Sequence, residues 1–248
     1  MSKSLIITCK LTGEMGKGVK SHIIPRSFYE IEPQENGSIE LMTNKKGEYN
    51  KRAPIGIYDQ DIFIEKGEKL FDKLDSFGAE LLINNFDSFK EINDSNNSLI
   101  AWSIQDYSYQ TIKLFVLSVI WRAHTSKQSF FSRVDLGIHA DKIKSMLLDS
   151  NPGDENQYSV NIVRWKSNDF GAMFMDPARV RFDEINYYQL YCGRYVFYIK
   201  IDKRESSKKL KKTQLTDGQD FLVVARDLEE SKEFSAMRKI AILKSKQQ

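Results

Sequence analysis

Short apolar runs separated by turn-rich polar segments predict extended structure in the first 64 residues. The runs cover residues 5–8, 19–24 and 55–64, and the polar segment 32–52 separates the last two. Pro25 disfavours helical backbone geometry at the residue before it. We therefore expect short strands here.

The apolar spacing becomes helical at residue 65. Leu70, Leu74, Phe77 and Leu81 recur at intervals of 4, 3 and 4, which predicts one face of a helix over residues 65–83. Residues 109–123 are apolar nearly all round and predict a helix packed on several sides, and residues 141–148 predict a shorter amphipathic helix.

The remainder of the chain predicts mainly strands and a terminal amphipathic helix over residues 229–246. Cys192-Gly193 predicts a turn or a bulge inside the longest apolar run. The predicted strands cover residues 158–165, 172–175, 179–182, 187–201 and 221–224. The fold class is therefore α+β, with central helices and a C-terminal antiparallel sheet.

The asparagine-rich segment 84–97 is the best candidate for a boundary. We predict one unit over residues 1–90 and a second over residues 98–248, an arrangement that also allows the two to pack together.

Composition indicates a globular protein, with 41% hydrophobic and 12% aromatic residues among 248. The two cysteines cannot form a disulfide framework, which favours a reducing compartment. Residues 1–8 lack the features of a signal peptide, and the most apolar stretch, residues 112–121, is shorter than the roughly 20 residues that cross a bilayer. We expect a cytoplasmic protein that does not interact with a membrane.

Charge is distributed unevenly around a net value of +3. Residues 1–100 hold 13 basic and 16 acidic side chains, and residues 101–248 hold 24 and 18. Part of the basic excess could meet nucleic-acid phosphate, and the alternative is a solvated loop. The predicted nucleic-acid-binding residues are Lys208, Lys209, Lys211 and Lys212.

The segment Lys20-Ser21-His22-Ile23-Ile24-Pro25-Arg26 holds the sharpest candidate for chemistry. A neutral imidazole on a strand can take a proton from water, and a nearby hard cation with oxygen ligands would stabilise charge on a scissile phosphate. The alternative is that His22 is a structural histidine.

We assign structural roles to the other residues whose side chains could take part in chemistry. His124 and His139 lie near predicted helix ends, and Cys192 has no neighbouring histidine to activate it. Arg122 leaves a buried helix, where a guanidinium usually has a fixed carboxylate or phosphate partner; we favour a role in the core over contact with a substrate.

Ser21-His22-Ile23-Ile24-Pro25 resembles the histidine strand of HNH (His-Me finger) endonucleases, especially a bacterial group with two Cys-x-x-Cys knuckles, the second leading into an acidic helix. The resemblance covers about the first 150 residues and, more faintly, the sheet region. It continues through residues 56–68, 73–78, 117–123 and 134–137. It implies an N-terminal degenerate treble-clef or ββα finger within residues 1–90.

The knuckle cysteines of that group are largely lost here. Cys9 stands at the first position, but its partner position is Thr12, and the second pair has become Ile64 and Gly67. Structural zinc needs four Cys or His ligands, so the sequence does not predict zinc.

The resemblance implies roles for individual residues. His22 would be the general base and Asp61 would orient it or bind the metal. Glu68 and Asp75 would be oxygen ligands for Mg²⁺ or Mn²⁺, and Ser21 occupies the place where a metal-binding His or Asp often precedes the base. The competing interpretation of the acidic residues is a solvated helix face.

Three functions are compatible with these features. The first is an HNH-like, metal-dependent endonuclease that hydrolyses DNA phosphodiesters, which the resemblance places in defence against phage or mobile DNA. The second is a catalytically inactive HNH-like subunit that binds a partner protein or nucleic acid. The third is an unrelated protein-binding domain.

Overall fold

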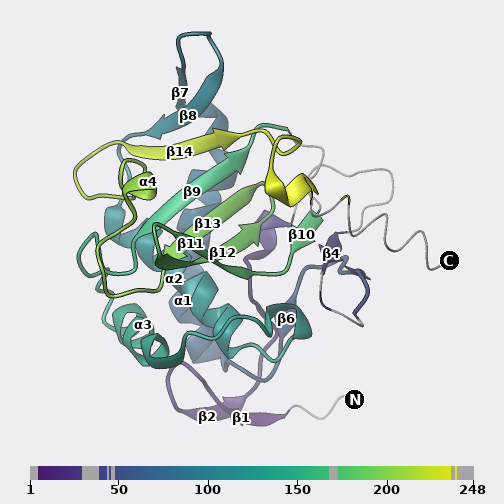
Figure 1. Cartoon of the computed structure of the whole chain (residues 1–248). Helices are drawn as coiled ribbons and strands as arrows, with labels where there is room; N and C mark the ends of the chain where they lie inside the picture. The colour runs from purple at the N-terminus through teal and green to yellow at the C-terminus, as the bar shows by residue number, and fades with distance from the viewer. Residues whose placement is uncertain are drawn as a thin grey trace, which may run out of the picture.

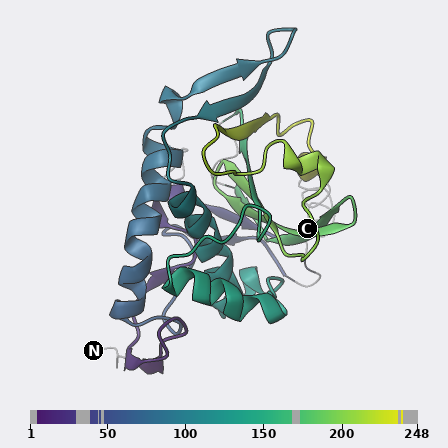
Figure 2. The same ribbon diagram turned by 90° about the vertical axis from the view of Figure 1, so that its left-hand side faces the viewer.

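The computed structural model describes residues 5–29, 39–43, 45, 48–167, 173–235 and 238. Its elements form an α+β fold, as the sequence predicts. A seven-stranded sheet has two long helices on one face (Figure 1), and the side view shows these helices packed side by side (Figure 2).

The large sheet has the strand order β11-β12-β13-β9-β14-β8-β7. Its strands are β7 (Lys90–Asn93), β8 (Leu99–Ile104), β9 (Val160–Trp165), β11 (Ala178–Phe182), β12 (Ile185–Cys192), β13 (Tyr195–Lys200) and β14 (Phe221–Arg226). Neighbours are antiparallel except β9 and β14, which run parallel. The sheet is thus mostly antiparallel, as predicted, but β7 and β8 join it from before the central helix.

The labelled α-helices in the described part of the chain are α1 (Glu65–Ala79), α2 (Tyr109–Thr125), α3 (Ala140–Leu148) and the single turn α4 (Lys208–Lys211). A π-helical turn, Glu80–Asn84, extends α1. Leu74, Phe77 and Leu81 of the predicted apolar face of α1 pack against the core. The fourth predicted residue, Leu70, is 50% exposed, whereas Phe71 and Leu82 are buried. Nearly every side chain of α2 is buried, as its composition predicts.

Three small sheets organise the N-terminal region. β1 (Ile6–Thr8) pairs with β2 (Met15–Lys17), β3 (Ser21–His22) pairs with β6 (Tyr58–Asp59), and β4 (Glu40–Met42) lies between β5 (Lys51–Arg52) and β10 (Met173–Met175). In the predicted extended run 55–64, Tyr58 and Asp59 form a strand, and Ile64 forms an isolated antiparallel bridge with Gly18. The β3–β6 pair lies directly before α1 in the chain, and β4 and β5 lie between its two strands in sequence.

A single buried cluster extends from the N-terminal region into the large sheet. Phe28 stacks on Phe115 of α2 at 5.6 Å between ring centroids, and Phe63 stacks on Trp121 at 6.0 Å. A second cluster, around Trp165, lies apart from the first. Aromatic packing therefore fixes the segments around Phe28 and Phe63 to α2.

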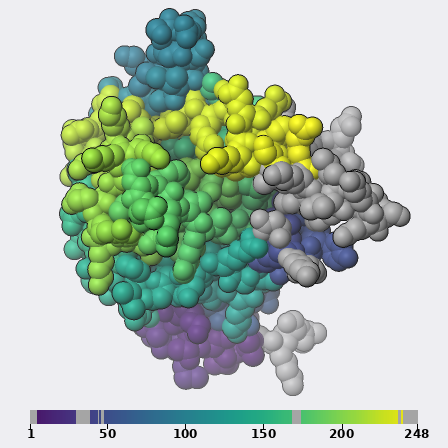
Figure 3. All heavy atoms as spheres, viewed as in Figure 1, coloured from purple at the N-terminus to yellow at the C-terminus, as the bar shows by residue number. Residues whose placement is uncertain are grey.

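Two segments predicted from the sequence, the boundary 84–97 and the helix 229–246, lie before and after most of the large sheet in the chain. Segment 84–97, the predicted boundary, contains β7, which forms with β8 a hairpin that projects from the body of the molecule (Figure 3). Of the predicted helix 229–246, residues 229–231 form a turn and a bend, residues 232–235 and 238 are helical, and the rest lies outside the described residues. No helix in the described ranges combines the length and apolarity needed to cross a bilayer.

Gly78 tests the close approach of α1 to α2. A Cβ added to Gly78 would lie 2.6 Å from ring atoms of Phe115. Alanine alone favours a helix over glycine by up to about 1 kcal/mol, whereas overpacking a core costs about 1–3 kcal/mol. We expect Gly78→Ala to lower the free energy of unfolding, measured by urea denaturation.

Ser76→Ala is the matched control, since Ser76 is exposed on the same helix. It should change stability by no more than about 0.5 kcal/mol. A stabilised Gly78→Ala protein would contradict the close packing of these helices.

Candidate functional site

The histidine strand β3 contains two residues, and a proline and a turn follow it closely. β3 pairs Ser21 with Asp59 and His22 with Tyr58, and after Pro25 the chain enters a 3-10 turn at Arg26–Phe28. Successive side chains of a strand point to opposite faces. Ser21 is accordingly fully buried, whereas the His22 side chain is only half-buried.

The His22 ring has a defined partner. Its Nε2 lies 2.8 Å from the carbonyl oxygen of Ile55, and its edge approaches the Tyr58 ring at 6.2 Å between centroids. A carbonyl oxygen only accepts hydrogen bonds, so Nε2 carries the proton and donates it. In the neutral ring, Nδ1 is then the nitrogen with an available lone pair.

Glu68 is held by Ser21 rather than by His22. The Ser21 hydroxyl donates a hydrogen bond to a Glu68 carboxylate oxygen across 47 positions of sequence. Burial raises the pKa of Glu68 above its ordinary value, against the opposing effects of the Ser21 hydrogen bond and the Arg122 charge. This serine–glutamate contact joins β3 to the first turns of α1.

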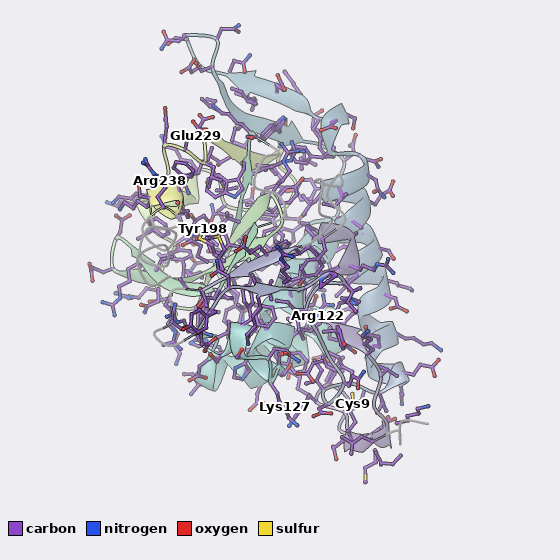
Figure 4. All side chains as sticks on the ribbon, turned by 90° about the vertical axis from the view of Figure 1, so that its right-hand side faces the viewer. Cys9, Arg122, Lys127, Tyr198, Glu229 and Arg238 are labelled. Atoms are coloured by element: carbon purple, nitrogen blue, oxygen red, sulfur yellow. The ribbon has the colours of Figure 1, made fainter. Side chains whose placement is uncertain are left out.

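Asp75 forms a bidentate ion pair with Arg122. The guanidinium nitrogens Nη1 and Nη2 lie 2.8 and 2.6 Å from the two carboxylate oxygens, and the arginine side chain is 0% exposed. Nη1 also donates to the backbone carbonyl of His22 at 3.2 Å. Arg122 therefore ties α2 to α1 and β3 from the interior of the molecule (Figure 4), in agreement with the carboxylate partner and core role predicted for it.

Asp61 points to the segment after α2. Its carboxylate lies 3.1 Å from Nζ of Lys127. The neighbouring Asp59 is buried, and it accepts hydrogen bonds from the Ser126 hydroxyl and the Lys127 amide. Asp59, which the sequence analysis did not select, fixes this segment against β6.

The four predicted catalytic and metal-binding residues thus contact four different groups. His22 contacts Ile55, Asp61 contacts Lys127, Glu68 contacts Ser21 and Asp75 contacts Arg122. A Mg²⁺ ion needs several oxygen ligands directed at one point. Within the described residues no three His, Cys, Asp or Glu side chains converge in that way, so this arrangement does not fit the metal that the resemblance implies.

The positions that the resemblance aligns with zinc knuckles lie together. Cys9 is 1% exposed, and its sulfur accepts a hydrogen bond from the Thr12 amide at 3.5 Å. A Cβ at position 67 would lie 2.5 Å from that sulfur, and the Ile64 side chain packs against Gly16. One thiol with apolar neighbours does not supply tetrahedral zinc ligation.

The remaining histidines make local contacts. His124 Nδ1 accepts a hydrogen bond from the Leu136 amide at 3.3 Å, and His139 Nδ1 lies 3.1 Å from the Tyr158 hydroxyl. Burial lowers the pKa of His139, and the charge of Lys203 acts in the same direction.

The four predicted nucleic-acid-binding lysines lie on and just after α4, and two of them are near carboxylates. Lys209 lies 3.6 Å from Asp183, and Lys211 lies 3.7 Å from Glu205.

A different group of lysines, which was not predicted from the sequence, lies near the histidine strand. Lys45, Lys51 and Lys127 are scattered over 82 positions, and no local sequence pattern connects them.

Comparison of the chain with protein families, with curated proteins and with solved structures gives no match. The interpretation of the site therefore depends on its residues and on their geometry.

Arg122 offers a test of the buried ion pair. Replacement with methionine leaves Asp75 without its cation and removes the donor to the His22 carbonyl. We expect Arg122→Met to lower the free energy of unfolding by about 3 kcal/mol, measured by urea denaturation.

The double variant Arg122→Met/Asp75→Leu should lose less than the two single variants added together, because it leaves no unpaired charge. Lys69→Gln serves as the control, because it removes an exposed ion pair with Glu65 on α1, the helix that carries Asp75. It should leave the unfolding midpoint nearly unchanged. A small effect of Arg122→Met, equal to that of the control, would refute the proposed importance of the pair.

Glu68 provides a pH test. A carboxyl group with a raised pKa binds more protons in the folded than in the unfolded state, so its contribution to stability declines as pH rises above the ordinary value of 4.5. We expect the stability of the wild type relative to Glu68→Gln to fall as pH rises through this window and then to level off. Side-chain NMR titration should place the Glu68 pKa above 4.5. A stability difference independent of pH would contradict the raised pKa.

Proposed function

We propose that this chain is a catalytically inactive HNH-like subunit that binds nucleic acid. The proposal combines three features: the order of the finger elements, the contacts made by the residues in catalytic positions, and a group of lysines on the same side of the finger.

The arrangement of the former knuckles supports the HNH-like part of the proposal. The Cys9–Thr12 turn and the start of α1 lie against each other, with the sulfur of Cys9 over the backbone of Gly67. Lys10 donates its amide to the Ile62 carbonyl at 2.8 Å, and Val19 donates to Phe63 at 3.0 Å. Two knuckles that have lost zinc ligands can keep this arrangement through backbone hydrogen bonds and apolar contacts.

The observation that carries the inactive part is the contact between Ser21 and Glu68. These residues stand in the place before the base and on the acidic helix, where the resemblance implies metal ligands. Their direct hydrogen bond joins strand to helix, as a shared metal ion would. Asp75 is paired with the Arg122 guanidinium in the same region, so both predicted carboxylate ligands contact protein groups rather than a metal ion.

An active endonuclease is the second candidate, and one observation favours it. The His22 side chain is half-buried rather than enclosed, and its Nδ1 has an available lone pair when Nε2 donates to Ile55. A general base needs such a lone pair within reach of water.

A cleavage assay separates the two candidates. We expect the intact chain to leave supercoiled plasmid DNA and single-stranded DNA and RNA uncut with Mg²⁺ or Mn²⁺, and to bind these nucleic acids in an anisotropy assay. His22→Ala should behave like the wild type in both measurements.

Cleavage that falls by about 10²–10⁴-fold in His22→Ala would establish His22 as a base and overturn the inactive assignment. Absence of nucleic-acid binding at low salt would overturn the binding assignment. Cutting that is equal in the two proteins would point to a contaminating nuclease, and repetition with repurified protein would remove it.

A further inference from the structure

We propose that the phosphodiester backbone of nucleic acid binds at a lysine surface around Ser129, rather than at α4. This inference rests on the proposed nucleic-acid binding and assigns its location. The lysine surface consists of Lys20, Lys45, Lys51 and Lys127 together with Tyr58, Gln128, Ser129 and Ser132.

Two ammonium groups converge on one serine in this surface. Lys45 Nζ donates to the Ser129 carbonyl and to the Ser132 hydroxyl, the latter at 2.8 Å. Lys51 Nζ donates to the Ser129 hydroxyl at 3.3 Å. These lysines come from the loop and strand of the β4–β5 hairpin, whereas the serines belong to the 3-10 turn after α2.

Contacts extend the surface to the histidine strand. Gln128 donates its side-chain amide to the Tyr58 carbonyl at 3.0 Å, and Lys20 Nζ lies 3.8 Å from the centre of the Tyr58 ring. The Tyr58 ring in turn meets the edge of His22. Lys127 lies at the edge of the molecule (Figure 4), next in sequence to Gln128.

The balance of charge distinguishes this surface from α4. Among the residues that the structure describes, the nearest carboxylate partner in the lysine surface is Asp61, which pairs with Lys127; Lys20, Lys45 and Lys51 pair with oxygens or a ring that carry no negative charge. On α4, Lys209 and Lys211 each approach a carboxylate. The lysine surface therefore has more uncompensated positive charge.

An anion would complete this arrangement. Cations that gather at one point repel each other, and a phosphate oxygen placed among them removes that repulsion and accepts their hydrogen bonds. Serine hydroxyls and backbone amides also contact phosphate in nucleic-acid complexes. The groups present read the backbone and not the base edges, so binding is expected to be independent of sequence.

The test compares two lysine pairs in the full chain. Binding of a fluorescent 30-base-pair DNA duplex and of the same sequence as single-stranded RNA is measured by anisotropy over a series of KCl concentrations. The variants are Lys45→Gln/Lys51→Gln and, as the matched control, Lys208→Gln/Lys212→Gln.

We expect the Lys45/Lys51 variant to lose about 1–2 units from the slope of log K against log salt, since each lost phosphate contact contributes about 0.9 for duplex DNA. The α4 control should keep the wild-type slope. Lys45→Arg/Lys51→Arg should restore the slope, which a purely structural role of these lysines does not predict.

The binding data distinguish a wrong location from a wrong function. An unchanged slope in the Lys45/Lys51 variant, with binding by the wild type, would overturn the location and leave the proposed function intact; loss only in the α4 variant would return the binding surface to α4. No binding by the wild type would overturn the proposed function and this inference together. Unfolding curves of all variants show whether a change in binding follows from a change in folding.

Discussion

The buried ion pair between Arg122 and Asp75, with the bond from Arg122 to the His22 carbonyl, joins α1 and β3 to α2. Removing a guanidinium from water is costly unless its donors are satisfied. Here the Asp75 carboxylate accepts two of the guanidinium hydrogen bonds, and the Ser118 hydroxyl and the His22 carbonyl accept others. The aromatic ring of Phe71 lies 5.0 Å from the guanidinium carbon and covers it. Because the partners come from β3, α1 and α2, the geometry of the histidine strand depends on a residue 100 positions away.

A metal centre and a hydrogen-bonded pair can have the same structural effect. Each fixes a strand to a helix at one point, and each needs polar groups that a core would otherwise exclude. The Ser21–Glu68 contact and the Arg122–Asp75 pair supply such points without a cation. These two contacts hold β3, α1 and α2 together through hydrogen bonds within the protein.

The sequence predicts the large elements well because their signals are local. The all-round apolar pattern of residues 109–123 can only suit a buried helix, and α2 has that environment. The glycine after Cys192 predicts the β12–β13 turn, where Gly193 adopts a positive φ of 61°. Three residues of the predicted face of α1, Leu74, Phe77 and Leu81, pack against the core. Leu70 is exposed instead, and the adjacent Phe71 is buried against Trp121, a contact that the spacing along the chain does not reveal.

The site was less predictable, since its contacts join residues far apart in the chain. Glu68 and Asp75 were identified as carboxylates near the histidine strand, but their partners, Ser21 and Arg122, follow from tertiary structure. The convergence of Lys45 and Lys51 on Ser129 likewise requires the β4–β5 hairpin to lie over the turn after α2. Spacing along a sequence carries no information about such pairings.

The position of β14 has a consequence for biosynthesis. This strand lies between β8 and β9, so within the described residues the backbone hydrogen bonds that link the two halves of the large sheet run through β14, the last strand in chain order. While the ribosome is still synthesising residues before 221, the inner edges of β8 and β9 have backbone donors and acceptors that await their partner. Completion of the sheet therefore follows emergence of β14 from the exit tunnel, and the nascent chain must avoid aggregation through these edges until then.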